Sequence, residues 1–144
     1  MCIRDRTKVG EAKARIPDII LVNGSHTMYA KYSHEIAAAV ERVCPVAHTP
    51  SIDEMVCQLM GREQEPPRAR QIALAIKQAI KADVGETLRC SIGMAPNRYL
   101  AKIASDMQKP DGLIGLLPSQ LPRALTQLEP VSYTHLTLPT KRIV

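Results

Sequence analysis

The chain has 144 residues, a formal net charge of +5, four cysteines, four tyrosines and neither Phe nor Trp. This length is enough for one domain with its own core, and no apolar run is long enough to span a membrane. No signal peptide is recognisable and the cysteines lack metal-ligand spacing. These features argue against a secreted disulfide framework and favour reduced thiols in the cytoplasm.

The two ends differ from the middle of the chain. Residues 1–6 and 131–140 resemble translated adapters of sequencing libraries, read from opposite strands. On this interpretation residues 1–6 and 131–144 are assembly scars outside the fold, and residues 7–130 are the natural segment. The alternative is a pair of genuine but unstructured tails. Much of the excess positive charge lies in these ends, so the net charge is weak evidence for a polyanionic partner.

Helix and strand patterns alternate through the first half of the natural segment. Residues 7–15 are typical of the end of a helix, and residues 18–22 predict a buried strand. Residues 25–43 predict a helix, because apolar side chains recur there at helical spacing. These side chains are Tyr29, Tyr32, Ile36, Val40 and Val43.

The middle of the chain contains a predicted strand pair followed by a helix. Residues 45–60 predict two short strands around a bend at Pro50 to Glu54. Residues 67–83 show the clearest helical periodicity in the sequence. The outer face of that helix is basic, with Arg68, Arg70, Lys77 and Lys81. Such a face could follow a nucleic-acid backbone, although an ordinary solvated helix has the same composition.

Residues 88–112 predict a strand that leads into a helix. Leu88 to Met94 alternate in character, which is typical of a strand, and Asn97 suits the N-cap of a helix that ends before Pro110. Arg98, Lys102 and Lys109 fall nearly on one line of this helix. The arrangement suits phosphate binding, but from spacing alone solvated helix positions are the more common explanation.

The last predicted elements are a strand at 113–117 and a helix at 118–128. The alternation of strands and helices along the chain predicts an α+β fold with one sheet and helices packed on it.

Two motifs resemble those of a known family. Residues 91–112 read Ser-Ile-Gly-Met-Ala-Pro-Asn-Arg-Tyr-Leu-Ala-Lys-Ile-Ala-Ser-Asp-Met-Gln-Lys-Pro-Asp-Gly, and Ser51-Ile52-Asp53-Glu54 is an acidic motif upstream. Together, in this order, they resemble the Y-family DNA polymerases, the translesion enzymes with a UmuC domain, and most of all the DNA polymerase IV branch. The similarity extends at lower density from about Lys8 to Pro130.

The resemblance implies a fold and a set of roles. The fold is the polymerase palm, a ferredoxin-like mixed sheet backed by helices, with residues 7–130 covering the end of the fingers and the palm. Asp53 and Glu54 match catalytic carboxylates that hold two Mg²⁺ ions, and Lys109 matches a lysine that contacts the triphosphate of the incoming nucleotide. Arg98 and Lys102 match basic positions near phosphates or DNA. The implied partners are primer-template DNA, a deoxynucleoside triphosphate and, in the full-length protein, a sliding clamp.

The acidic pair has a less specific explanation when it is taken alone. An Asp-Glu pair at a strand bend is more often a solvated turn than a metal site, whereas the resemblance favours the metal site. Neighbouring carboxylates point to opposite faces of a regular strand, so a shared ligand requires the backbone to bend at Asp53 and Glu54. We also expect Asp106 to form a helical ion pair with Lys102, four residues before it.

The sequence departs from the family pattern in several places. It has no Asp-x-Asp-x-Phe-Phe stretch, which in the family supplies the first metal-binding aspartate. The phosphate-binding part of the fingers, the thumb and the little finger also have no counterpart. We therefore expect a region that is incomplete at both ends, has an exposed sheet edge, folds with low stability and is inactive alone. The alternatives are a non-catalytic homologue that binds DNA or a protein partner, and another palm-like enzyme such as a nucleotide cyclase.

Overall fold

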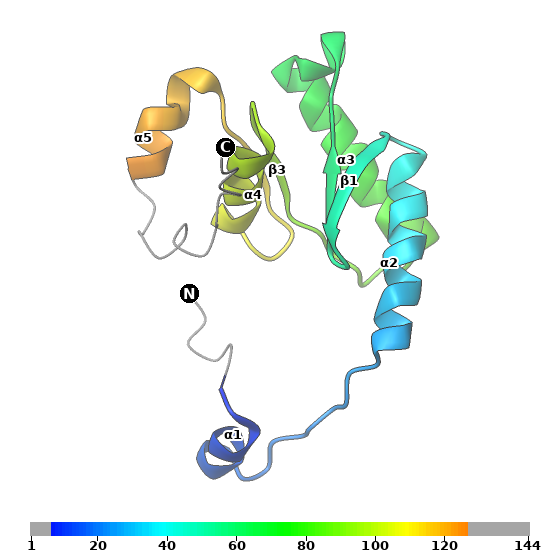
Figure 1. The fold of residues 1–144 in the computed structure, drawn as a ribbon, viewed down its shortest axis with the longest axis vertical. Coiled ribbons are helices and arrows are strands. Elements are labelled where there is room, and N and C mark those ends of the chain that lie inside the picture. Colours follow the sequence, from blue (N-terminus) through cyan, green and yellow to red (C-terminus); the bar gives the residue numbers. More distant parts are fainter. Residues whose placement is uncertain (1–6, 127–144) are drawn as a thin grey trace, which may run out of the picture.

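The computed structural model describes residues 7–126 and has a mixed helix and strand architecture (Figure 1). None of the described helices is long and apolar enough to cross a membrane. The helices are α1 (Val9–Arg15), α2 (His26–Glu41), α3 (Pro66–Asp83), α4 (Arg98–Met107) and α5 (Leu121–Thr126). The strands are β1 (Val46–Ser51), β2 (Glu54–Cys57), β3 (Ile92–Met94) and β4 (Leu113–Gly115). Short 3₁₀ helices are η1 (Gly61–Gln64) and η2 (Pro118–Gln120).

The first half of the fold is built from α2, α3 and the antiparallel hairpin β1–β2 (Figure 1). Ala39 and Val40 of α2 meet Ile80 of α3 in a small buried cluster, and side chains of both hairpin strands pack against it. The apolar spacing of the two helices predicts that each buries one face, because residues three and four apart lie on the same side of a helix. Only the C-terminal half of α2 is covered, since Tyr29 is 59% exposed.

The second half is a β3–α4–β4 unit in which the two strands are parallel and the helix connects them. Gly93 of β3 lies directly against α4, and a Cβ at that position would stand 2.0 Å from the carbonyl oxygen of Ala101. Ile103 and Ala104 are the side chains of α4 that this contact buries. The glycine inside the strand therefore sets how closely the helix approaches the sheet.

Two sequence predictions about strands differ from the structure. The sequence predicts a single sheet, but the structure has two separate two-stranded ladders, β1–β2 and β3–β4. None of the described strands pairs with both ladders, so they do not form one sheet. The strand predicted at Leu88 to Met94 is paired only from Ile92 onward.

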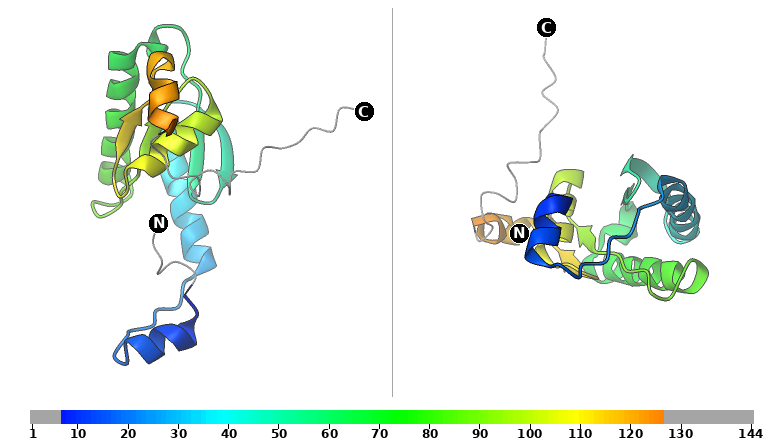
Figure 2. Two further views of the ribbon diagram at one scale, coloured as in Figure 1. Left: turned by 90° about the vertical axis from the view of Figure 1, so that its left-hand side faces the viewer. Right: turned by 90° about the horizontal axis from the view of Figure 1, so that it is seen from below.

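The predicted buried strand at 18–22 is wrong. These residues form no strand, and Ile20 and Val22 are 85% and 86% exposed. An apolar run becomes a buried strand only where another strand and a helix face are available to cover it, and none of the described elements covers this one. Figures 1 and 2 show that α1 stands away from the remaining elements at the end of this extended segment.

The remaining predicted elements agree with the structure within a few residues. The helices at 25–43 and 67–83, the helix that follows the N-cap Asn97, the strand pair around Pro50 and the strand at 113–117 are all present. The final helix is present as η2 and α5 up to Thr126, and its predicted end at 128 lies outside the described residues. The two predicted scars, at 1–6 and 131–144, lie outside them too.

Candidate active site

The β1–β2 hairpin presents the two acidic residues at its tip. Ser51 and Glu54 are paired across the ladder, so the chain reverses direction over Ile52 and Asp53. This reversal is the bend that the sequence requires if neighbouring carboxylates are to serve one site. The hydroxyl of Ser51 donates a hydrogen bond of 2.6 Å to Oδ1 of Asp53, which fixes the carboxylate at the turn.

Helix α4 presents the basic side of the site. The Oδ1 atom of Asn97 accepts a hydrogen bond of 2.9 Å from the backbone N–H of Leu100, so Asn97 is the N-cap that the sequence predicts. Burial of Ile103 and Ala104 against β3 fixes the rotation of the helix. Lys102 consequently lies at the boundary of the packed face, where its side chain is 32% exposed.

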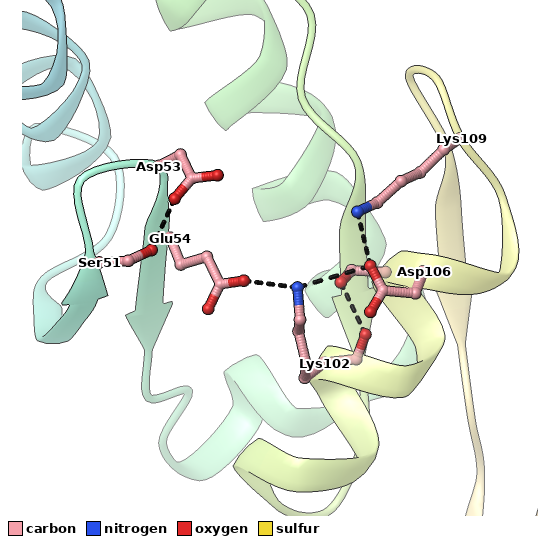
Figure 3. A network of polar contacts seen from close by, with 7 residues as sticks. Ser51, Asp53, Glu54, Lys102, Asp106 and Lys109 are labelled. Atoms are coloured by element: carbon pink, nitrogen blue, oxygen red, sulfur yellow. Dashed lines mark hydrogen bonds and ion pairs between the residues drawn. The ribbon is translucent and has the colours of Figure 1, made fainter. Parts of the chain in front are cut away.

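A continuous run of ion pairs joins the hairpin to the end of α4 (Figure 3). The Nζ atom of Lys102 lies 2.5 Å from Oε1 of Glu54 and 3.5 Å from Oδ1 of Asp106. The same Oδ1 atom lies 2.6 Å from Nζ of Lys109. Two acids and two lysines from three segments of the chain thus share one small volume.

The protonation state of Lys102 follows from this geometry. Partial burial on its own would lower the pKa of Lys102, but the hydrogen bond to Glu54 and the charges of Asp106 and Glu54 outweigh that effect. The pKa of Lys102 is therefore raised above its usual value, and the residue is a stable ammonium against the Glu54 carboxylate.

The structure brings most of the predicted site residues together. Glu54, Lys102 and Lys109 belong to one polar cluster, and Asp53 lies at the adjoining turn (Figure 3). The predicted helical ion pair between Lys102 and Asp106 is confirmed. Arg98 stays outside the cluster: it is exposed, and its side chain makes no hydrogen bond or ion pair with the described residues.

The acidic pair fits a divalent cation only as part of a larger ligand set. Among residues 7–126 no group of three or more His, Cys, Asp or Glu side chains could hold a metal ion. Mg²⁺ is commonly bound through one or two carboxylates and completes its octahedron with water and substrate phosphates, so Asp53 and Glu54 suit that type of site. The ammonium of Lys102 already shows that Glu54 faces a cation here.

One residue beside the site was predicted only as part of a basic helix face. Lys77 of α3 is 16% exposed and contacts the loop that follows α4. The sequence contains a signal for its burial, because Ala73 and Ile80, four residues before it and three after it, belong to the apolar stripe of this helix.

Comparison with known proteins gives consistent matches. A model of the impB/mucB/samB family matches residues 1–106. A DNA polymerase IV from Shewanella baltica (strain OS195) is 38% identical over 106 residues, which are 74% of this chain and 29% of that protein. A DNA polymerase IV from Clostridium kluyveri is 35% identical over 119 residues, which are 83% of this chain and 29% of the relative. The crystal structure of DinB from Sulfolobus solfataricus matches with a TM-score of 0.75 at 26% identity, covering 86% of this chain and 36% of that chain.

Fold and site together define a domain of the Y-family polymerase class, and the resemblance predicted from the two motifs is confirmed. The chain belongs to the impB/mucB/samB family. The predicted α+β class, palm-like and incomplete, is confirmed by the match to the DinB structure. The chain spans about a third of the length of these relatives, between 29% and 36%.

Proposed function

We propose that this chain is part of the palm of a DNA-directed DNA polymerase of lesion bypass, which adds deoxynucleotides to a primer. The observation that carries the proposal is the run of ion pairs from Glu54 through Lys102 and Asp106 to Lys109. It joins the acidic turn to the lysine after α4, so a cation and a polyphosphate can lie next to each other between them.

Each side chain has a distinct task in this proposal. Asp53 and Glu54 would hold Mg²⁺, which would supply charge stabilisation for the attacking and leaving oxygens of a phosphoryl transfer. Lys109 contributes positive charge to the triphosphate of the incoming nucleotide. Lys102 positions Glu54 and compensates its charge, while Asp106 holds both lysines on the same side of the helix.

The remaining partners also follow from the family. Primer-template DNA and a deoxynucleoside triphosphate are the proposed substrates, and phosphate contacts would supply most of the affinity for DNA. Arg98, exposed at the start of α4, is a proposed contact to phosphate or DNA. The sliding clamp and the cytoplasmic location stay predictions from the resemblance and the composition. We also retain the prediction that the chain is inactive alone.

Primer extension by a chimera tests the proposal. The 119 residues of this chain that align with the Clostridium kluyveri DNA polymerase IV replace the matching segment of that protein. We expect Mg²⁺-dependent extension, with Asp53→Asn and Glu54→Gln each lowering kcat by about 100-fold or more because each removes a metal ligand. The matched control is Glu86→Gln, an exposed acid outside the site, which should change kcat by less than about twofold.

The same experiment separates the alternatives. A folded chimera that binds primer-template but does not extend it would contradict the proposal and support the non-catalytic homologue. Extension that survives both Asp53→Asn and Glu54→Gln would show that the acidic turn is not the metal site. The 144-residue chain tested alone should give no extension.

A further inference from the structure

Lys77 is the most strongly coordinated lysine of the described residues. Its Nζ atom donates to the carbonyl oxygen of Cys90 at 2.6 Å, to the carbonyl oxygen of Asp111 at 2.9 Å and to Oδ1 of Asp111 at 2.5 Å. An ammonium has three N–H donors, so three acceptors satisfy it completely. Only 16% of the side chain is exposed, and this residue is therefore not part of a solvated helix face.

The acceptors belong to two segments that flank the candidate active site. Cys90 precedes β3, and Asp111 lies in the loop between α4 and β4. Gly112 completes the connection: its N–H donates to Oγ of Ser91 at 3.1 Å, and its carbonyl accepts from the N–H of Ile92 at 3.0 Å. Lys77 of α3 thus binds the loop at Asp111, while Ser91 and Ile92, at the start of β3, bind it at Gly112.

The loop has little freedom to move away from these contacts. Asp111 has a φ of +60°, a left-handed conformation that needs support from its surroundings when the residue is not glycine. A Cβ at position 112 would lie 2.0 Å from the carbonyl oxygen of Gln108, so the backbone of the loop is folded tightly on the end of α4. The hydrogen bond from Lys77 also lowers the pKa of the Asp111 carboxyl.

Lys109 stands in this loop, two residues before Asp111, and its own side chain is 57% exposed. We propose that Lys77 is a positioning residue, which fixes the backbone of residues 109–112 so that Lys109 is presented to the phosphates of a nucleoside triphosphate. The inference rests on the proposed function, in which Lys109 contacts that triphosphate. If the backbone that carries Lys109 is already fixed, less conformational entropy is lost when the anion binds, and the anion binds more tightly.

Inorganic triphosphate without metal is the probe, titrated into the 144-residue chain at constant ionic strength and followed by amide NMR shifts of the loop. We expect Lys77→Met to weaken binding about tenfold. Lys77→Arg should recover at least half of the binding free energy that Lys77→Met loses, because its guanidinium can still donate to Asp111. Lys81→Met is the matched control: it removes an exposed charge one turn along α3 that has no hydrogen bond or ion pair with the described residues, and it should change affinity by less than twofold.

A second variant separates positioning from simple electrostatics and does not depend on Lys77 substitutions folding. Asp111→Asn removes a negative charge, so charge alone predicts tighter triphosphate binding. Positioning predicts weaker binding, because the neutral amide oxygen of Asn accepts from Lys77 less strongly than the carboxylate does and so holds the loop less firmly. Equal losses for Lys77→Met and Lys81→Met, or tighter binding by Asp111→Asn, would overturn the inference.

The outcomes also distinguish this inference from the proposed function. If the wild-type chain binds triphosphate and Lys109→Met does not weaken it, the proposed role of Lys109 fails and the inference fails with it. If Lys109→Met weakens binding and Lys77→Met does not, only the inference fails. If the chimera is inactive but the triphosphate affinities of the variants change as expected, the polymerase proposal is rejected. The positioning role of Lys77 then remains supported.

Discussion

At the scale of single residues, Cys57 shows how packing changes chemistry. Burial raises the pKa of its thiol to about 12, and the neighbouring Cys44 adds to the shift. Because the folded-state pKa lies above the usual 9.0, the neutral thiol favours the folded state below about pH 9. That contribution to stability is lost as the pH rises from about 9 toward 12.

We therefore predict that Cys57 resists alkylation in the folded chain. At pH 9 only about one folded molecule in a thousand carries the thiolate, against about half of the unfolded molecules. Iodoacetamide labelling followed by peptide mass spectrometry should show Cys57 reacting at least about 100-fold more slowly in buffer than in urea. Equal rates in the two solvents would contradict both the partial burial of Cys57 and its raised pKa.

The residue scale also shows which parts of the site the sequence could predict. Lys102 and Asp106 are four apart on a helix, so their ion pair follows from local geometry. The contact of Lys102 with Glu54 joins residues 48 positions apart and depends on how the hairpin packs beside α4. No local pattern encodes that packing, and the same reason explains why the three contacts of Lys77 could not be predicted.

At the scale of elements, the interface of β3 with α4 sets the position of the lysine-bearing helix. A methyl group on Gly93 would lie 2.0 Å from the carbonyl oxygen of Ala101 and 2.5 Å from the backbone nitrogen of Ser105. Both atoms belong to the helix backbone and cannot rotate away, so the helix itself would have to shift. Overpacking of this kind costs about 3 kcal/mol.

We predict that Gly93→Ala loosens α4, and that amide hydrogen exchange in residues 101–105 accelerates by about 100-fold. Gly115→Ala is the control within the same ladder, because its Cβ would meet only the terminal methyl of Met94 at 3.4 Å. That variant should change exchange by less than about threefold. Similar acceleration by both substitutions would contradict the close contact of β3 with α4.

Helices were easier to predict than strands in this chain, for a physical reason. The helices at 26–41, 66–83 and 98–107 form their backbone hydrogen bonds locally, so periodicity and a cap such as Asn97 are enough to place them. A strand needs a partner that the local sequence does not specify. The run at 18–22 has strand composition but no pairing among the described residues, whereas the hairpin at 46–57 has its partner within a two-residue turn.

At the scale of the whole molecule, the described region has a small core divided between two units. The ten buried apolar residues include only five larger than alanine or cysteine: Val40, Ile72, Ile80, Ile103 and Leu116. Two-stranded ladders such as β1–β2 and β3–β4 are marginal by themselves and leave backbone groups unpaired along their edges. The contact of α3 with β4 connects the units, together with the side-chain contacts of Lys77 with Asp111 and of Lys102 with Glu54.

Large apolar side chains remain on the surface of this small core, including Ile20, Val22, Met28, Tyr29 and Met60. We predict that the 144-residue chain has a free energy of unfolding below about 5 kcal/mol, under the usual range for domains, because little apolar surface is removed from water. It should also bind a hydrophobic dye such as ANS and associate increasingly as its concentration rises, since open strand edges and apolar patches favour contact between copies.

Urea unfolding followed by circular dichroism, with sedimentation at several concentrations, measures both effects. The chimera described above is the internal comparison, because there the same residues lie within a full-length polymerase. If the chain alone unfolds in one cooperative transition with a free energy of unfolding above about 5 kcal/mol and stays monomeric, it is an independent domain and the expectation of low stability is wrong. A broad transition at low urea that sharpens in the chimera would show that residues 7–126 depend on neighbouring polymerase segments for their stability.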